Sequence, residues 1–194
     1  MAERLIVISD MWGAKKGIWA TSYLVYLQQY FDVTYYDSQQ LANIDLVDNS
    51  GERLKDAFLN GGVDKAIAQL MLNEKEPCHY VGFGIGGTIA WQANLQGLPM
   101  KSLYMVSTTP VGYENNKLGI PTKMVYGELD ANLPPKKWFD QIEEEHEIIK
   151  GFGHDLYTYD TNIKKIAQDL LSLVTNKIKT KAKVIPIRKP LLVS

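Results

Sequence analysis

The stretch YVGFGIGG, residues 80–87, decides the fold. It begins with a short apolar run and continues into a turn in which four of the six residues from 82 to 87 are glycine. Residues 88–95 read as a helix, and Gly97 ends it. Glycine lets the backbone turn sharply and lets strand and helix approach closely, and the first amides of the helix point at whatever lies above Gly84. The stretch therefore predicts a strand-turn-helix unit with an anion-friendly corner at residue 84.

Apolar runs and helical periodicities alternate on both sides of this unit. Short strands are predicted at residues 5–8, 33–36, 80–83, 103–106, 123–126 and 146–149. Helices are predicted from about residue 19 and at 63–71, 88–95 and 163–174. Strands that alternate with helices indicate an α/β fold, here a three-layer αβα sandwich around a mainly parallel sheet of about five to six strands.

Two segments lie outside this alternation. Residues 38–60 are polar and lack sustained periodicity, so we expect an irregular connection with one short helix near 52–59. We place the domain at residues 1–178 and a tail at 179–194; from Lys177 to the last residue the chain has six basic residues and no acidic one. The tail is expected either to lie over an edge of its own domain or of a partner subunit in a homo-oligomer, or to be solvated.

The overall composition excludes several classes of function. With 21 basic and 22 acidic residues the chain has no electrostatic footprint for nucleic acid, which we do not expect as a partner. The single cysteine, Cys78, has no disulfide partner in the chain, and the three histidines show no zinc-ligand spacing, so we expect no metal and no cofactor. The N-terminal apolar run is shorter than a signal peptide or a membrane span, and we expect a cytoplasmic protein.

Two further loops leave the carboxyl ends of predicted strands, where ligands bind in sheets of this kind. The segment 126–130, Tyr-Gly-Glu-Leu-Asp, follows a buried strand and ends in Asp130. The segment 151–154, Gly-Phe-Gly-His, follows the last strand and ends in His154, just before the closing helix. Gly84, Asp130 and His154 are therefore expected to meet at one edge of the sheet.

The three loops together resemble those of α/β-hydrolases, whose nucleophile elbow reads G-x-S-x-G and whose chain order is nucleophile, acid, histidine. The resemblance covers roughly residues 4–176 and places Gly84 where such enzymes carry the nucleophile. It implies that His154 acts as general base and acid and that Asp130 holds its tautomer. It also implies an oxyanion hole made by the amide of Ile85 and by an amide from the first loop, at Met11 or Trp12.

Other interpretations of these residues stay open. Gly84 could simply satisfy a tight turn, and Asp130 could be a turn residue. A dinucleotide site is disfavoured, because the glycines are out of register with G-x-G-x-x-G and follow a middle strand. Cys78 lies at the wrong end of its strand, and Ser107-Thr108 have no elbow to present them as replacement nucleophiles.

The resemblance implies a small carboxylic-ester or thioester hydrolase that lacks the serine nucleophile. Such a protein is either weakly active, through a water molecule that His154 activates, or inactive. The alternative is a pseudoenzyme that binds a small acyl ligand or a protein partner. Only about fifteen residues separate the strands that end near 106 and begin near 122, which leaves no room for a helical lid and predicts an open cleft. Trp12 and Trp19 are candidates to line it.

Overall fold

The computed structural model describes residues 2–46, 50–109 and 116–181, with side chains as far as residue 173. Within these ranges the strands are β1 (Glu3–Ile8), β2 (Phe31–Tyr36), β3 (Cys78–Phe83), β4 (Met100–Val106), β5 (Thr122–Gly127) and β6 (Glu145–Ile149). All neighbouring strands are parallel, in the order β2-β1-β3-β4-β5-β6. The predicted parallel α/β sheet is confirmed, and it has six strands.

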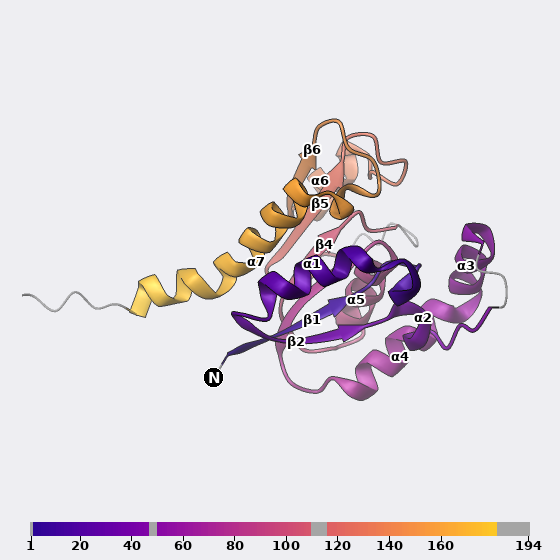
Figure 1. The fold of residues 1–194 in the computed structure, drawn as a ribbon, viewed down its shortest axis with the longest axis horizontal. Coiled ribbons are helices and arrows are strands. Elements are labelled where there is room, and N and C mark those ends of the chain that lie inside the picture. The colour runs from indigo at the N-terminus through magenta and orange to yellow at the C-terminus, as the bar shows by residue number, and fades with distance from the viewer. Residues whose placement is uncertain (1, 47–49, 110–115, 182–194) are drawn as a thin grey trace, which may run out of the picture.

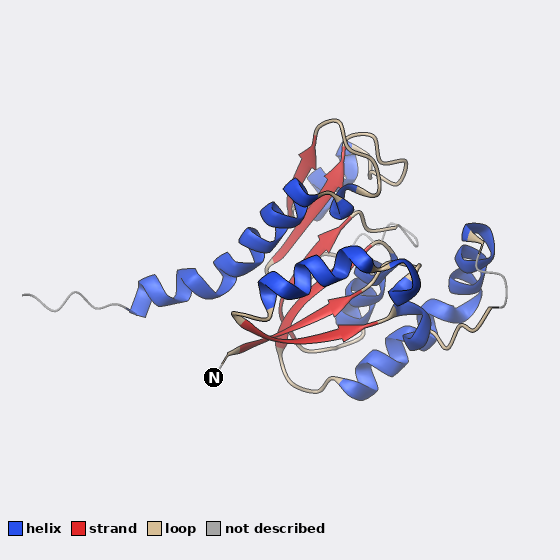
Figure 2. Cartoon of the chain, viewed as in Figure 1, coloured by secondary structure: helices blue, strands red, loops and turns tan. Residues whose placement is uncertain are grey.

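The helices are α1 (Ile18–Leu27), α2 (Ser38–Leu41), α3 (Gly51–Ala57), α4 (Val63–Asn73), α5 (Ile85–Leu95), α6 (Lys136–Ile142) and α7 (Asp160–Lys181). Helices α1 and α7 pack together on one face of the sheet, and α4 and α5 pack on the other (Figures 1 and 2). This is the predicted three-layer arrangement. Helix α7 continues past the edge of the sheet (Figure 1).

The first strand shows why an unbroken apolar run predicts a central strand. Leu5 and Val7 point into the core beneath α1 and α7, whereas Ile6 and Ile8 point into the core beneath α4 and α5. All four side chains are fully buried. Because successive side chains of a strand face opposite ways, a strand covered on both faces needs apolar residues at every position.

The structure differs from the sequence-based prediction in residues 38–60. Two helices form there, α2 and α3, where one was expected. The Asp37 carboxylate caps α2 by accepting hydrogen bonds from the amides of Gln39 and Gln40, and the Ser50 hydroxyl accepts one from the amide of Arg53 at the start of α3. Such caps stabilise helices too short for their periodicity to be seen.

Other differences lie at helix boundaries. Helix α5 begins at Ile85, three residues before the predicted start, since Gly86 and Gly87 belong to its first turn. Helix α6 was not predicted. Helix α7 runs through the proposed domain boundary at residue 178 and ends at Lys181. The rest of the predicted tail lies outside the described residues, and so does its proposed role in an oligomer. Among the described helices none has the length and apolar character needed to cross a membrane.

Candidate active site

The turn between β3 and α5 is built around glycines that cannot be replaced. A Cβ added at Gly82 would lie 2.5 Å from the backbone of Gly87, and one at Gly86 would lie 2.4 Å from the carbonyl oxygen of Ser9. Real side chains do not make contacts this short, so the close packing of β1, β3 and α5 requires glycine at both positions.

Gly84 is different, because space does not demand a glycine there. A Cβ added to it would meet its nearest neighbour, Cβ of Asp10, at 3.4 Å, which is ordinary contact. Its backbone has φ +51° and ψ −120°, a conformation that L-residues rarely adopt. Strain of this kind at a strand-to-helix turn exposes the side chain of a nucleophile in α/β-hydrolases. Residue 84 therefore has elbow geometry and room for a side chain.

Asp130 lies in the turn after β5, and its side chain is buried. Its carboxylate accepts hydrogen bonds from the amide of Asn132 at 2.8 Å and from Nδ1 of His154 at 3.0 Å. Burial by itself raises the pKa of Asp130, but the hydrogen bonds from His154 and Asn132 outweigh it, and the net pKa is lowered. Asp130 is thus held as a carboxylate against the imidazole.

His154 follows β6, and its side chain is 39% exposed. With Nδ1 donating to Asp130, the neutral imidazole carries its free lone pair on Nε2. That nitrogen lies 3.7 Å from the position of a Cβ at residue 84. The structure thus brings together Gly84, Asp130 and His154 from three separate loops, with the basic nitrogen directed at the position without a side chain.

The amides proposed for an oxyanion hole are only partly placed as expected. Ile85 is the first residue of α5, so its amide has no carbonyl within the helix to bond. The Trp12 amide donates instead to Oδ1 of Asp10 at 3.0 Å. Met11 then remains as the candidate from the first loop. The peptide that carries its amide is held through the carbonyl oxygen of Asp10, which accepts hydrogen bonds from the Ser9 hydroxyl and the Gly13 amide.

Asp10 is one of the site residues that the sequence analysis did not single out. It follows β1 and is only 4% exposed, and it accepts a hydrogen bond from the Tyr157 hydroxyl at 2.9 Å as well as the one from Trp12. Burial raises the pKa of Asp10, against the opposing effect of these hydrogen bonds. An acidic residue directly after a buried strand was the one available signal, since that position lies at the ligand-binding edge of the sheet.

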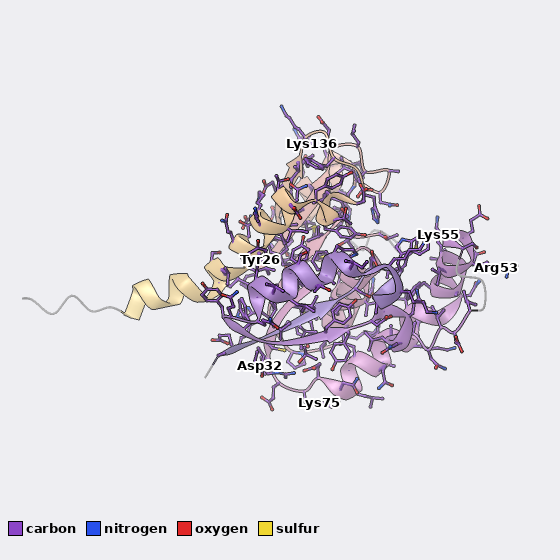
Figure 3. The ribbon with its side chains drawn as sticks, viewed as in Figure 1. Tyr26, Asp32, Arg53, Lys55, Lys75 and Lys136 are labelled. Atoms are coloured by element: carbon purple, nitrogen blue, oxygen red, sulfur yellow. The ribbon has the colours of Figure 1, made fainter. Side chains whose placement is uncertain are left out.

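A pocket of about 170 Å³ joins these residues. Its lining comprises Asp10, Met11, Trp12, Lys55, Gly84, Ile85, Thr109, Asn132, His154 and Tyr157. Lys55 belongs to α3, at the edge of the molecule (Figure 3). Trp12 lines the pocket as expected, but Trp19 does not, because it packs in the core against Phe83 and Tyr157.

No cysteine or serine is among the described residues that line this pocket. Cys78 is buried at the start of β3, and burial raises the pKa of its thiol. Ser107 is buried at the end of β4, where its hydroxyl helps to lower the pKa of Asp130. Within the described ranges no three His, Cys, Asp or Glu residues gather as metal ligands.

Comparison with known proteins addresses the fold. No protein-family model matches the sequence, and no curated protein matches it significantly. Among solved structures, a protein assigned to the alpha/beta hydrolase superfamily from Xanthomonas campestris pv. campestris is similar over 90% of this chain and 99% of its own, with 15% identity and a TM-score of 0.66.

Two further solved structures are similar to the same extent. A carboxylesterase structure from Nitrososphaera gargenis matches 91% of this chain and 92% of its own, with 14% identity and a TM-score of 0.66. The mouse alpha/beta hydrolase domain-containing protein 10 matches the same shares, with 12% identity and a TM-score of 0.65. At these identities the likeness concerns the fold, and the chain has the α/β-hydrolase fold.

Proposed function

We propose that the pocket binds small carboxylic esters or thioesters and hydrolyses them only slowly, by direct attack of water, because residue 84 supplies no nucleophile. The observation that carries the proposal is the position of His154 Nε2, 3.7 Å from a Cβ at Gly84, with Nδ1 bonded to a buried carboxylate. This is the geometry of a base that activates a group at residue 84.

In the proposed reaction a water molecule takes the place of the missing hydroxyl. Its oxygen bonds to the carbonyl carbon while its proton passes to Nε2 of His154, and the amides of Ile85 and Met11 stabilise the resulting oxyanion. The bond to the leaving group then breaks, and His154 returns the proton to that group. Binding and an oxyanion hole alone still supply roughly 10³ to 10⁴ over the uncatalysed rate.

The dimensions of the pocket limit the substrate. At about 170 Å³ it is smaller than the cavities of roughly 300–1,000 Å³ that hold drug-sized ligands. Acyl groups of a few carbons fit this volume, which supports a short-chain substrate.

The decisive experiment restores the nucleophile. Gly84→Ser places a hydroxyl beside His154 Nε2, and hydrolysis of p-nitrophenyl acetate should rise on the order of 10² to 10⁴-fold over the parent. A fluorophosphonate should label residue 84 in this variant. Gly84→Ala is the matched control, since it adds the same Cβ and the same backbone strain without the hydroxyl, and its rate should stay at the parent level.

A second control removes the base. Gly84→Ser combined with His154→Ala should lose both the gain in rate and the labelling. If Gly84→Ser folds, as judged by its thermal unfolding, yet neither hydrolyses the ester nor reacts with the fluorophosphonate, the hydrolase proposal is wrong. Binding of an acyl ligand or a protein partner without turnover would then replace it.

A further inference from the structure

Asp10 is an acidic residue that lies beside residue 84, as His154 does. Its Cβ lies 3.4 Å from the position of a Cβ at residue 84, and Nε2 of His154 lies 3.7 Å from the same point. Both residues line the pocket. A ligand group that occupies the position of the missing side chain therefore contacts both of them.

The hydrogen-bond donors to Asp10 do not carry a positive charge of their own. One carboxylate oxygen accepts from the Trp12 amide and the other from the Tyr157 hydroxyl, and both donors are neutral. No lysine, arginine or histidine of the described residues forms an ion pair with it. The Gly13 amide and the charge of His154 also favour the ionised form of Asp10. A carboxylate has about four acceptor positions, so three donors do not exhaust it.

Lys55 brings the opposing charge to the pocket, but its position weakens its effect. It is an exposed residue of α3, so water and salt screen its charge. Asp10 is only 4% exposed, and charges interact more strongly in such surroundings. Of these two charges, that of Asp10 is therefore the less screened at the pocket.

We propose that Asp10 determines the ligand preference of the pocket, which favours a group that donates hydrogen bonds, such as a primary amide or an ammonium group, over a carboxylate. This inference rests on the proposed function in that it concerns the same pocket, and it names the class of compound bound there. It also means that the carboxylate product of ester hydrolysis is held more weakly than its neutral substrate.

The test uses three compounds of nearly the same shape and different head groups: butyramide, butylammonium and butyrate. Each is titrated into the parent protein at about pH 7.5, where a free carboxyl group is ionised, and binding is followed by the amide shifts in ¹H-¹⁵N spectra. Butyramide and butylammonium should bind at least about tenfold more tightly than butyrate. Equal or tighter binding of butyrate by the parent would overturn the inference without any variant being made.

Two variants then assign the preference to one residue. Asp10→Asn keeps the shape of the side chain and removes its charge, so the preference for butylammonium over butyrate should disappear. Lys55→Gln is the matched control on the opposite charge and should leave the order of the three compounds unchanged. An unaltered preference in folded Asp10→Asn would contradict the role of Asp10. Because these measurements follow binding, they can fail while the Gly84→Ser assay succeeds, and the reverse.

Discussion

Two loops, one after β1 and one after β5, each bring a buried carboxylate to the candidate site, and the two carboxylates behave in opposite ways. Asp10 lines the pocket, whereas Asp130 contacts it through His154. Asp10 and Asp130 are 4% and 5% exposed, and each accepts a hydrogen bond from the amide two residues later in the chain. Yet the pKa of Asp130 is lowered and the pKa of Asp10 is raised. Their exposed fractions are almost equal, but Asp10 is enclosed more deeply by the surrounding protein, and this desolvation is the main cause that raises its pKa.

The second partner of each carboxylate adds to the difference. Asp130 faces Nδ1 of His154, which becomes positively charged when it accepts a proton at Nε2. Asp10 faces the hydroxyl of Tyr157, which donates a hydrogen bond and stays neutral. A buried carboxylate beside a group that takes up positive charge supports catalysis, whereas one beside a neutral donor contributes an uncompensated charge. The two loops therefore have opposite effects on the same site.

The largest expected effect is on activity once the nucleophile is restored. In the Gly84→Ser background, Asp130→Asn should reduce ester hydrolysis on the order of 10³ to 10⁴-fold, because the imidazole loses the partner that fixes its tautomer. Asp10→Asn in the same background should raise the rate by about tenfold, because it removes a negative charge beside the developing oxyanion. Initial rates with p-nitrophenyl acetate measure both.

The two substitutions replace the same residue type by the same amide, so each is the control for the other. If both lower the rate to a similar extent, Asp10 supports catalysis as Asp130 does, and the contrast between the two loops would not hold for activity.

A smaller effect is expected on stability. Tyr157→Phe deletes the hydroxyl that donates to Asp10 and leaves a buried carboxylate oxygen without that donor, which should cost about 1–3 kcal/mol of unfolding free energy in urea. In the loop that carries Asp130, Asn132→Ala removes the side-chain contact to His154 but keeps the hydrogen bond from the residue 132 amide to Asp130. This substitution should cost less than about 0.5 kcal/mol of unfolding free energy. Tyr157→Phe should also cost less when Asp10→Asn is already present. Additive losses in that pair would argue against a coupled hydrogen bond.

The smallest effect is expected in the pH dependence of stability. The lowered pKa of Asp130 means that its contribution is fully present above the unfolded pKa of about 3.9 and is lost as the pH falls through its folded pKa. The raised pKa of Asp10 means that its contribution is fully present below the unfolded pKa and is lost as the pH rises through its folded pKa.

Urea unfolding of the parent, Asp10→Asn and Asp130→Asn from about pH 3 to about pH 7 measures how the unfolding free energy of each depends on pH. The loss of stability in Asp130→Asn should shrink toward the acid end of the range. The stability of Asp10→Asn relative to the parent should increase as the pH rises above about 4. Parallel curves for the two variants would mean that the carboxylates do not differ in their folded-state ionisation.

Much of this molecule could be predicted from the sequence because local patterns carry it. The apolar run Leu5–Ile8 predicts a strand buried on both faces, and that is where it lies. The glycines of residues 82–87 predict a strand-to-helix turn, and the structure shows that backbone packing requires two of them. The short helix α2 could not be foreseen in the same way, because four residues are too few to show a helical period.

The sequence by itself determined the order of strands and helices, and hence the edge of the sheet at which Gly84, Asp130 and His154 meet, because the carboxyl ends of parallel strands share one edge. Only the tertiary structure decided what surrounds them. The Tyr157 hydroxyl reaches Asp10 across 147 positions of the chain, and Lys55 of α3 lines the same pocket as Gly84. Such contacts depend on loop conformation and on the packing of distant segments, and no local pattern of residues encodes them.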